Sequence, residues 1–296
     1  MNRTRSSYIF AGLAVFFWST IPTAFKIGLR ELEVIPMLTI AVVTSTVVLF
    51  IIVLSEHKLS GLKRMTFIEL LLSALLGFIN PFLYYIILLR AYQLLPAQIA
   101  QPLNMIWPVI LVFLSVPILK QRIPAKSFIA LTISFAGVYV ISSQGQLFNP
   151  GRANPLGVLL ATGSSVFWAL FFILNLKDKR DESVKLFTGF LFASVYLILV
   201  YFISGKSDLS VSLRGAAASV YIGIFEMGIG FFLWLKALHL AENSAKVSNL
   251  VYLAPFLSLL FVHFIIKEPV YYTTPIGLLL IISGIWVQGR KTNNRE

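Results

Sequence analysis

The sequence predicts an all-α, polytopic membrane protein of ten transmembrane helices, arranged as two five-helix repeats of opposite orientation. Three observations predict it: a very apolar composition, a series of long apolar runs, and similarity between the two halves of the chain. Of the 296 residues, 58% are hydrophobic and only 12% are charged. A soluble domain carries about 25% charged residues, so we expect most of the surface to face lipid.

The apolar runs set the number of helices. About 20 apolar residues span a bilayer, and runs of about this length lie at 8–29, 34–54, 66–90, 96–119, 124–143, 155–176, 184–203, 214–238, 243–266 and 272–289. The breaks between them carry charges and turn formers, and none is long enough to hold another domain. The first run follows Arg3 and Arg5 but is longer than the apolar part of a signal peptide, so we expect a retained helix.

Charge distribution predicts the orientation. The net charge is +12, yet the basic residues lie in short loops rather than on one soluble module, which argues against nucleic acid as a partner. With the N-terminus inside, 17 of the 24 Lys and Arg residues fall on the inner side, as the positive-inside rule requires. We therefore expect a multi-pass protein of the cell membrane with both termini cytoplasmic, as a monomer or a homodimer.

Internal similarity divides the chain at residues 1–148 and 149–296. At a shift of 147 residues Pro108 aligns with Pro255, and Lys120 aligns with Lys267. A shift of 146 residues aligns Gly77 with Gly223 and Arg90 with Lys236, and a shift of 150 residues aligns Phe17-Trp18 with Phe167-Trp168. Because five is an odd number, the second half enters the membrane upside down. Inverted repeats around a site near the midplane are a recurring transporter architecture.

A pattern in the first half and its echo in the second carry a resemblance to a known family. The pattern is Ala91-Tyr92, Pro96-Ala97, Trp107-Pro108 and Lys120, and the echo is Ala237-Leu238, Ser244-Ala245, Tyr252-Leu253-Ala254-Pro255 and Lys267-Glu268. Over nearly the whole chain this pattern resembles the paired EamA domains of the drug/metabolite transporter superfamily. The resemblance implies ten helices, a central cavity between the halves, and export of metabolites, amino acids or drugs. The family's usual Gly-Glu after helices four and nine is kept in part, because Lys120-Gln121 lacks the acid.

Glu226 is the leading candidate for a functional residue. It lies near the middle of the eighth apolar run, where a carboxyl is costly unless it faces a cavity or a partner. Its neighbours at helical spacing are Ser219, Gly223 and Gly230, so we expect it on a groove of small residues. It would bind substrate or carry a proton; the alternative is a structural hydrogen bond. Its repeat counterpart is Asn80, where the following proline can open the third helix.

Other polar and aromatic residues of the predicted spans are candidates for the cavity lining: Tyr84, Asn104, Trp107, Trp18, Trp168, Asn175, Asn249 and Tyr252. Tryptophan rings inside helices could stack on a flat or cationic substrate. The alternatives are that polar residues join helices and that the rings pack against each other. Lys26 and Arg90 could meet an anionic substrate at the outer mouth or act as interface anchors.

Several kinds of chemistry are excluded by missing motifs. The sequence has no phosphate-binding Gly-Lys-Ser/Thr loop, no cysteine, no histidines spaced as metal ligands and no nucleophile motif. We therefore expect a protein that binds no cofactor and no metal and is not an enzyme. The prediction is a secondary transporter of small metabolites, an exporter working by alternating access, with protons as the expected coupling ion. A lipid-carrier flippase and an uncoupled exchanger of the same fold stay open, while an intramembrane enzyme is disfavoured.

Overall fold

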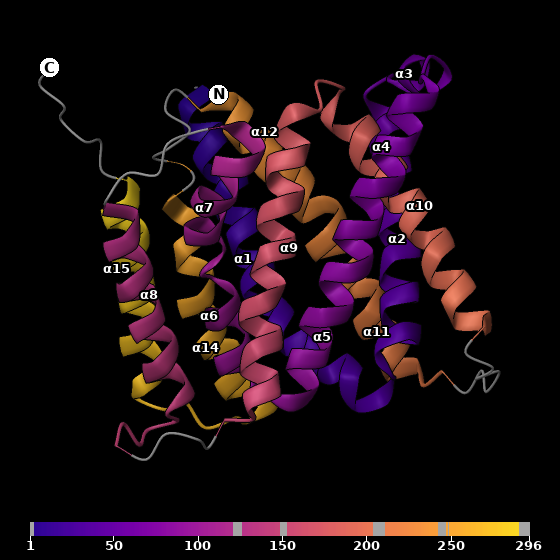
Figure 1. Cartoon of the computed structure of the whole chain (residues 1–296). Helices are drawn as coiled ribbons and strands as arrows, with labels where there is room; N and C mark the ends of the chain where they lie inside the picture. The colour runs from indigo at the N-terminus through magenta and orange to yellow at the C-terminus, as the bar shows by residue number, and fades with distance from the viewer. Residues whose placement is uncertain are drawn as a thin grey trace, which may run out of the picture.

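The computed structural model describes residues 3–120, 126–148, 153–203, 211–241, 247 and 249–289, and this part of the chain forms helices and turns without strands (Figure 1). The all-α prediction is confirmed. Seven helical stretches are long and apolar enough to cross a membrane: Arg3–Glu31, Val34–Ser55, Phe67–Leu94, Ala97–Ile118, Pro155–Asn175, Glu182–Ile203 and Leu213–Leu238. Three shorter apolar helices add to these at Ser127–Ser142, Leu250–Ile266 and Thr273–Val287. The count of ten spans therefore stays a prediction.

Helices of the first half follow the predicted runs, with breaks inside the third and fourth. They are α1 (Arg3–Glu31), α2 (Val34–Ser55), the short α3 (Leu59–Lys63), α4 (Phe67–Gly77), η1 (Phe78–Leu83), α5 (Tyr84–Leu94), α6 (Ala97–Asn104), α7 (Trp107–Leu119) and α8 (Lys126–Ser142). Asn80 leaves helical geometry inside η1, at φ −149° and ψ 121°. The residue before a proline is pushed out of the helical region by the ring, which explains the opening.

Helices of the second half show a break at the equivalent place. They are α9 (Pro155–Lys177), α10 (Glu182–Ile203), α11 (Leu213–Ile222), η2 (Gly223–Gly228), α12 (Ile229–Leu240), η3 (Asn249–Tyr252), α14 (Leu253–Ile266) and α15 (Thr273–Gly289). The break at η1 is a kink at Asn80 between two helical segments, whereas η2 is a π-helical turn, and such turns often lie at functional sites. Helix starts are capped locally: Asn154 and Ser212 each accept a backbone N–H three residues on.

The packing exchanges partners between the two halves. The main partners of α1 are α11, α12 and α14, all from the second half, whereas α9 packs against α5, α6 and α7 of the first half. In the same way α10 lies against α4 and η1, and α2 lies against α11 and η2. The fifth helices, α8 and α15, pack side by side at one edge of the bundle (Figure 1). Each half therefore buries its third helix on the first two helices of the other half.

Two equivalent glycines explain how closely these helices approach. A side-chain carbon at Gly77 would collide with the backbone carbonyl of Gly189 on α10, and one at Gly223 would collide with the carbonyl of Ala41 on α2. Small residues allow helix backbones to approach closely in membrane bundles. The two glycines hold η1 and η2 against opposite halves of the chain.

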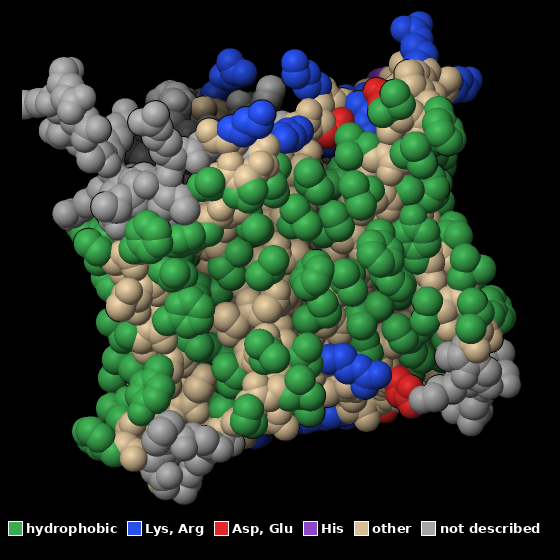
Figure 2. Space-filling model, in the orientation of Figure 1, with side chains coloured by type: hydrophobic (Ala, Val, Ile, Leu, Met, Phe, Trp, Pro, Cys, Tyr) green, Lys and Arg blue, Asp and Glu red, His purple; other side chains and the backbone are tan. Residues whose placement is uncertain are grey.

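The surface follows the same arrangement. Hydrophobic side chains cover the middle of the visible face, and Lys and Arg side chains gather along its upper edge, with fewer at the lower edge (Figure 2). The start of α1 and the end of α15 lie at the upper end of the bundle (Figure 1). An apolar band between charged edges is the surface that a membrane-embedded protein requires.

Candidate functional site

Glu226 lies inside the bundle, on the π-turn η2, and as a residue it is partly buried. Its Oε1 accepts a hydrogen bond from the Tyr85 hydroxyl at 2.9 Å. Tyr85 belongs to α5 and is fully buried. The bond therefore joins the third helix of one half to the third helix of the other.

The indole of Trp18 holds the backbone of the same turn. Its Nε1 donates to the carbonyl of Glu226 at 3.3 Å. A side-chain carbon at Gly230 would lie 2.7 Å from that nitrogen, so a glycine is needed there to make room for the ring. The small-residue surface predicted around Glu226 thus receives α1 as well as α2.

A second chain of hydrogen bonds runs beside the first. The Tyr84 hydroxyl donates to Asn104 Oδ1 at 3.1 Å, and Asn104 Nδ2 donates to the Ser164 hydroxyl at 2.8 Å. These residues come from α5, α6 and α9. Tyr84 and Tyr85 are adjacent, with ring centroids 4.7 Å apart, so the two hydrogen-bonded groups are in contact.

Aromatic rings connect the predicted tryptophans. Trp168 lies 5.0 Å from Tyr84, 5.7 Å from Phe231 and 6.4 Å from Trp107, measured between ring centroids. Phe231 also lies 6.1 Å from Trp18. These are ordinary distances for aromatic pairs. The structure therefore brings six predicted residues into one connected group: Glu226, Trp18, Tyr84, Asn104, Trp107 and Trp168.

Asn80 lies apart from this group. Its side chain is 2% exposed, and neither its Nδ2 nor its Oδ1 has a partner within the described residues. It lies on η1, which packs against α9 and α10, whereas η2 packs against α1 and α2. Equivalent positions in the repeat thus lie against equivalent helices of the opposite half. A buried amide without partners costs about 1–3 kcal/mol, so Asn80 is an unsatisfied polar group inside the bundle.

Three other predicted residues have different surroundings. Asn175 lies near the end of α9, where its carbonyl accepts from Lys185 Nζ at 3.2 Å. Tyr252 ends η3 and packs against the core. The side chain of Asn249 lies outside the described residues. Among the described residues, no group of three or more His, Asp or Glu side chains could hold a metal ion.

Sequence reasoning missed Tyr85 and Ser164. The available signal was chemical: a tyrosine hydroxyl inside a predicted span must find an acceptor, since burying it without one is costly. The acceptor itself could not be predicted, because it comes from a helix 141 residues away.

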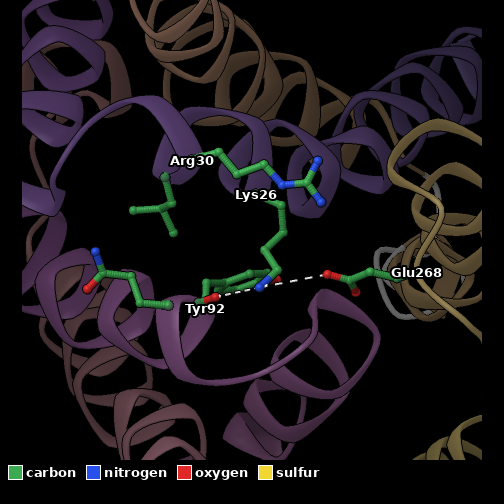
Figure 3. Close-up of a pocket in the computed structure, with 6 residues that line it drawn as sticks. Lys26, Arg30, Tyr92 and Glu268 are labelled. Carbon is green, nitrogen blue, oxygen red and sulfur yellow. Dashed lines mark hydrogen bonds and ion pairs between the residues drawn. The ribbon is translucent and has the colours of Figure 1, made fainter.

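Lys26 and Glu268 form an ion pair at the lower end of the bundle. We call this pair, together with the hydrogen bonds of its two side chains, the clasp (Figure 3). Lys26 Nζ lies 3.7 Å from Glu268 Oε1 and donates to the carbonyls of Tyr92 and Leu95, each at 2.8 Å. Glu268 Oε2 accepts the backbone N–H of Ala97 at 2.8 Å. A pocket of about 250 Å³ opens beside the pair, lined by Lys26, Leu29, Arg30, Tyr92, Gln93 and Glu268.

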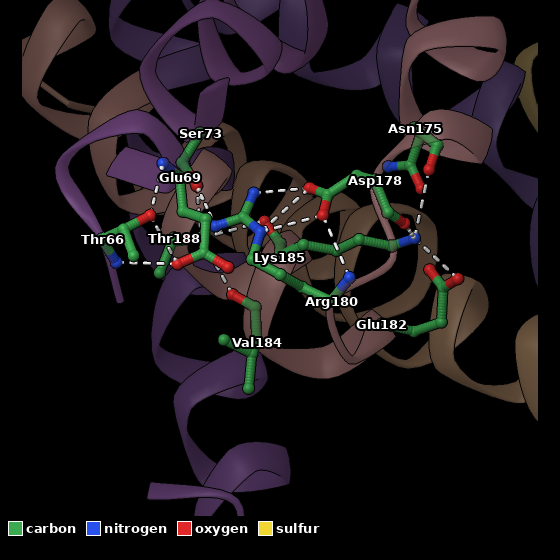
Figure 4. Close-up of polar contacts among 10 residues, drawn as sticks. All are labelled: Thr66, Glu69, Ser73, Asn175, Asp178, Arg180, Glu182, Val184, Lys185 and Thr188. Atoms are coloured by element: carbon green, nitrogen blue, oxygen red, sulfur yellow. Dashed lines mark hydrogen bonds and ion pairs between the residues drawn. The ribbon is translucent and has the colours of Figure 1, made fainter. Parts of the chain in front are cut away.

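A second polar group, the Arg180 cluster, lies at the opposite end (Figure 4). Arg180 Nε bonds both carboxylate oxygens of Asp178, at 2.9 and 3.0 Å, and its Nη1 donates to the Ser73 hydroxyl at 2.8 Å. Lys185 Nζ donates to the carbonyl of Asp178 at 3.2 Å and pairs with Glu182 Oε1 at 2.7 Å. Burial alone would raise the pKa of Asp178, but hydrogen bonds from Arg180 outweigh it and lower the pKa below its ordinary value.

Comparisons with known proteins agree with this architecture. The sequence profile of the EamA-like transporter family matches residues 5–143 and again residues 155–289. An uncharacterized transporter of Archaeoglobus fulgidus is 26% identical over 96% of this chain and 99% of its own length. The uncharacterized transporter YvbV of Bacillus subtilis is 28% identical over 100% and 95%. A solved crystal structure shares the fold at a TM-score of 0.65 and 19% identity, covering 97% of each chain. The chain belongs to the EamA-like transporter family and is a multi-pass membrane transporter.

Proposed function

We propose that this transporter is a secondary exporter of a small metabolite, with Glu226 as the group that binds substrate or carries a coupling proton. The observation that carries the proposal is the Tyr85–Glu226 hydrogen bond. It places the carboxylate of the second half against a buried tyrosine of the first half, at the contact between the elements that alternating access has to move.

The surroundings of Glu226 support a role beyond packing. Glu226 as a residue is partly buried, and no Lys, Arg or His of the described residues lies within ion-pair distance of its carboxylate. A mid-membrane acid without a cationic partner is a functional candidate, because evolution otherwise avoids its cost. Trp18, which bonds the Glu226 carbonyl, contacts Phe231, and Phe231 contacts Trp168, so a series of aromatic rings for a substrate begins at this turn.

We also propose the arrangement that this cycle requires. Residues 1–148 and 149–296 form two inverted five-helix halves in the cell membrane, with both termini cytoplasmic. Support comes from the exchanged packing of α1 and α9, from the equivalent turns η1 and η2, and from the left-handed residues that end α7 and α14, Lys120 and Lys267.

The test begins with substrate discovery. Purified protein is screened by thermal shift against amino acids, nucleosides, cationic drugs and lipid phosphates, and each stabilising compound is then followed across proteoliposome membranes with and without a pH gradient. In Glu226→Gln we expect transport of the hit to fall at least tenfold and the response to the gradient to disappear, while expression and monodispersity are unchanged.

Two variants serve as controls. Tyr85→Phe keeps the carboxylate and removes one hydrogen bond, worth about 1 kcal/mol, so it should retain gradient dependence with reduced rate. Glu31→Gln removes an exposed carboxylate at the end of α1 and should transport normally. Normal transport with normal gradient dependence in Glu226→Gln would exclude the assigned role. Transport without any gradient response in the parent protein would identify an uncoupled exchanger.

A further inference from the structure

We propose that the clasp is the outer gate of the transport cycle, so that the Lys26–Glu268 contact must break before the Glu226 region opens to the lower end of the bundle. This inference rests on the proposed alternating-access function. The upper-edge concentration of Lys and Arg makes the lower end the outer one.

The clasp joins parts of the chain that have to separate. Lys26 is on α1, Tyr92 and Leu95 are at the end of α5, and Glu268 follows α14 in the second half. The same loop is tied to α6 by a second residue: Gln98 Oε1 accepts from the Tyr271 N–H at 3.0 Å and from the Thr274 hydroxyl at 3.1 Å. Gln98 Nε2 also donates to the carbonyl of Pro269. One loop of the second half thus closes over two helices of the first.

Its chemistry suits a contact that breaks and re-forms. The Lys26 and Glu268 side chains are 17% and 14% exposed, and a pocket of about 250 Å³ beside the pair has room for water. Water can therefore solvate both charges when they part, which makes separation far less costly than for a dry pair. At 3.7 Å the pair is also longer than the 2.7–2.9 Å of a tight charge-assisted bond.

The clasp is connected to the candidate site through two helices. Lys26 follows Trp18 by eight residues on α1, and Tyr92 follows Tyr85 by seven on α5. Residues seven or eight apart share a helix face, about 11–12 Å apart along the axis. Trp18 and Tyr85 are the two residues that bond Glu226. A change in the contacts of Glu226 is therefore transmitted to the two helices that carry the clasp.

A cysteine-accessibility assay tests the gate without a substrate. The chain has no cysteine, so one introduced thiol reports alone. Thr23 is one turn inward of Lys26 on the same face of α1; it is 3% exposed, and its hydroxyl has no partner within the described residues. Thr23→Cys is therefore a conservative reporter. Leu213→Cys, at a position 87% exposed at the same end, identifies the membrane side that carries the clasp.

The protein is labelled with a membrane-impermeant maleimide in intact cells and in inverted vesicles. On the side where Leu213→Cys reacts, we expect Thr23→Cys to react slowly in the parent and at least several times faster when Glu268→Gln or Lys26→Gln is added. Lys26→Arg, which keeps the charge and the donors for the Tyr92 and Leu95 carbonyls, should retain slow labelling. Glu31→Gln, which removes a carboxylate at the same end, should leave the rate unchanged.

Unchanged labelling of Thr23→Cys in both single variants would overturn the gate, as would an equal increase in Glu31→Gln. These outcomes are separate from a failure of the proposed function. A protein that transports through Glu226 with no change in labelling has a different outer gate. A protein whose labelling responds but whose Glu226→Gln variant transports normally keeps the gate and loses the site.

Discussion

The clasp and the Arg180 cluster close opposite ends of the bundle with similar groups in different arrangements. In the Arg180 cluster the ion pair joins residues two positions apart, and the side chains of Arg180 and Asp178 are 9% and 3% exposed. In the clasp the pair joins the first helix to a loop near the end of the chain, and the side chains of Lys26 and Glu268 are 17% and 14% exposed.

This difference separates a structural contact from a movable one. Motion of whole helices cannot separate Asp178 from Arg180, because both belong to the connection between α9 and α10. Their link to the first half is the hydroxyl of Ser73. The clasp has no such local tie, and every bond in it crosses between distant segments. The Lys26–Glu268 pair joins residues far apart in the sequence and is the more exposed of the two pairs. We therefore expect the end that carries the clasp to open at the lower cost in free energy.

The largest expected effect is on stability in Arg180→Met. The substitution leaves the Asp178 carboxylate buried without its cation, and breaking a buried pair by removing one partner costs about 3–5 kcal/mol. We expect a marked fall in the free energy of unfolding, measured by titration with a denaturing detergent and followed by tryptophan fluorescence.

The matched control removes both charges. In Asp178→Asn with Arg180→Met the uncompensated carboxylate is gone, so much of the lost stability should return. A double variant as unstable as Arg180→Met alone would show that the shape of the guanidinium, which also bonds Ser73, matters more than charge compensation. Charge burial would then not be what distinguishes the Arg180 cluster from the clasp.

A smaller effect of the same kind is expected in acid. The pKa of Asp178 is lowered in the folded protein, because the hydrogen bonds from Arg180 outweigh burial. A lowered pKa contributes stability above the unfolded value of about 3.9, and that stability is lost as the pH falls through the folded pKa. Melting temperatures measured from pH 7 downward should drop below about pH 4. The drop should be shallower in Asp178→Asn, and an identical profile in that variant would contradict the assignment.

The sequence predicted the positions of helices and single polar residues better than the contacts between helices. Positions of helices were predicted well, since a lipid surface requires apolar runs of a certain length. Glu226 was found because a carboxylate in such a run is costly, and Asn80 because it is the repeat counterpart of Glu226. The alignment of the repeat set Asn80 against Glu226, and the turns that carry them pack on equivalent helices, η1 on α9 and α10 and η2 on α1 and α2.

Hydrogen-bond and ion-pair partners on helices far apart in the sequence could not be predicted. Tyr85 meets Glu226 because α5 and η2 pack in a particular register, and Lys26 meets Glu268 because one loop folds over two helices. Neither register leaves a periodic signal in the sequence. The π-turn η2 was also missed: it contains no proline, and the close approach of α2 at Gly223 and of the Trp18 ring at Gly230 accompanies it. The binding roles of these residues stay predictions for the transport assays above.

A smaller effect on stability than in Arg180→Met is expected in Glu268→Gln, and it sharpens the comparison between the two regions. The glutamine keeps an oxygen for the Ala97 N–H, Lys26 keeps its bonds to two carbonyls, and the neighbouring pocket has room for water to solvate its charge. We expect the free energy of unfolding to change by less than about 1 kcal/mol, as for other water-accessible pairs, in the same detergent titration that detects the loss in Arg180→Met. A loss as large as that in Arg180→Met would make the clasp a structural contact.

Glu31→Gln shows whether the result belongs to the clasp or to surface charge at that end. Glu31 Oε1 lies 3.9 Å from Arg214 Nη1, and the two side chains are 29% and 68% exposed. Exposed pairs of this length contribute close to nothing, so stability and the accessibility of Thr23→Cys should both stay at parent values. Glu268→Gln should change accessibility alone, and Arg180→Met should change stability most. Each of these three substitutions removes one charge, yet we expect three different outcomes. The three pairs differ in how exposed their side chains are and in how far apart their residues lie in the sequence.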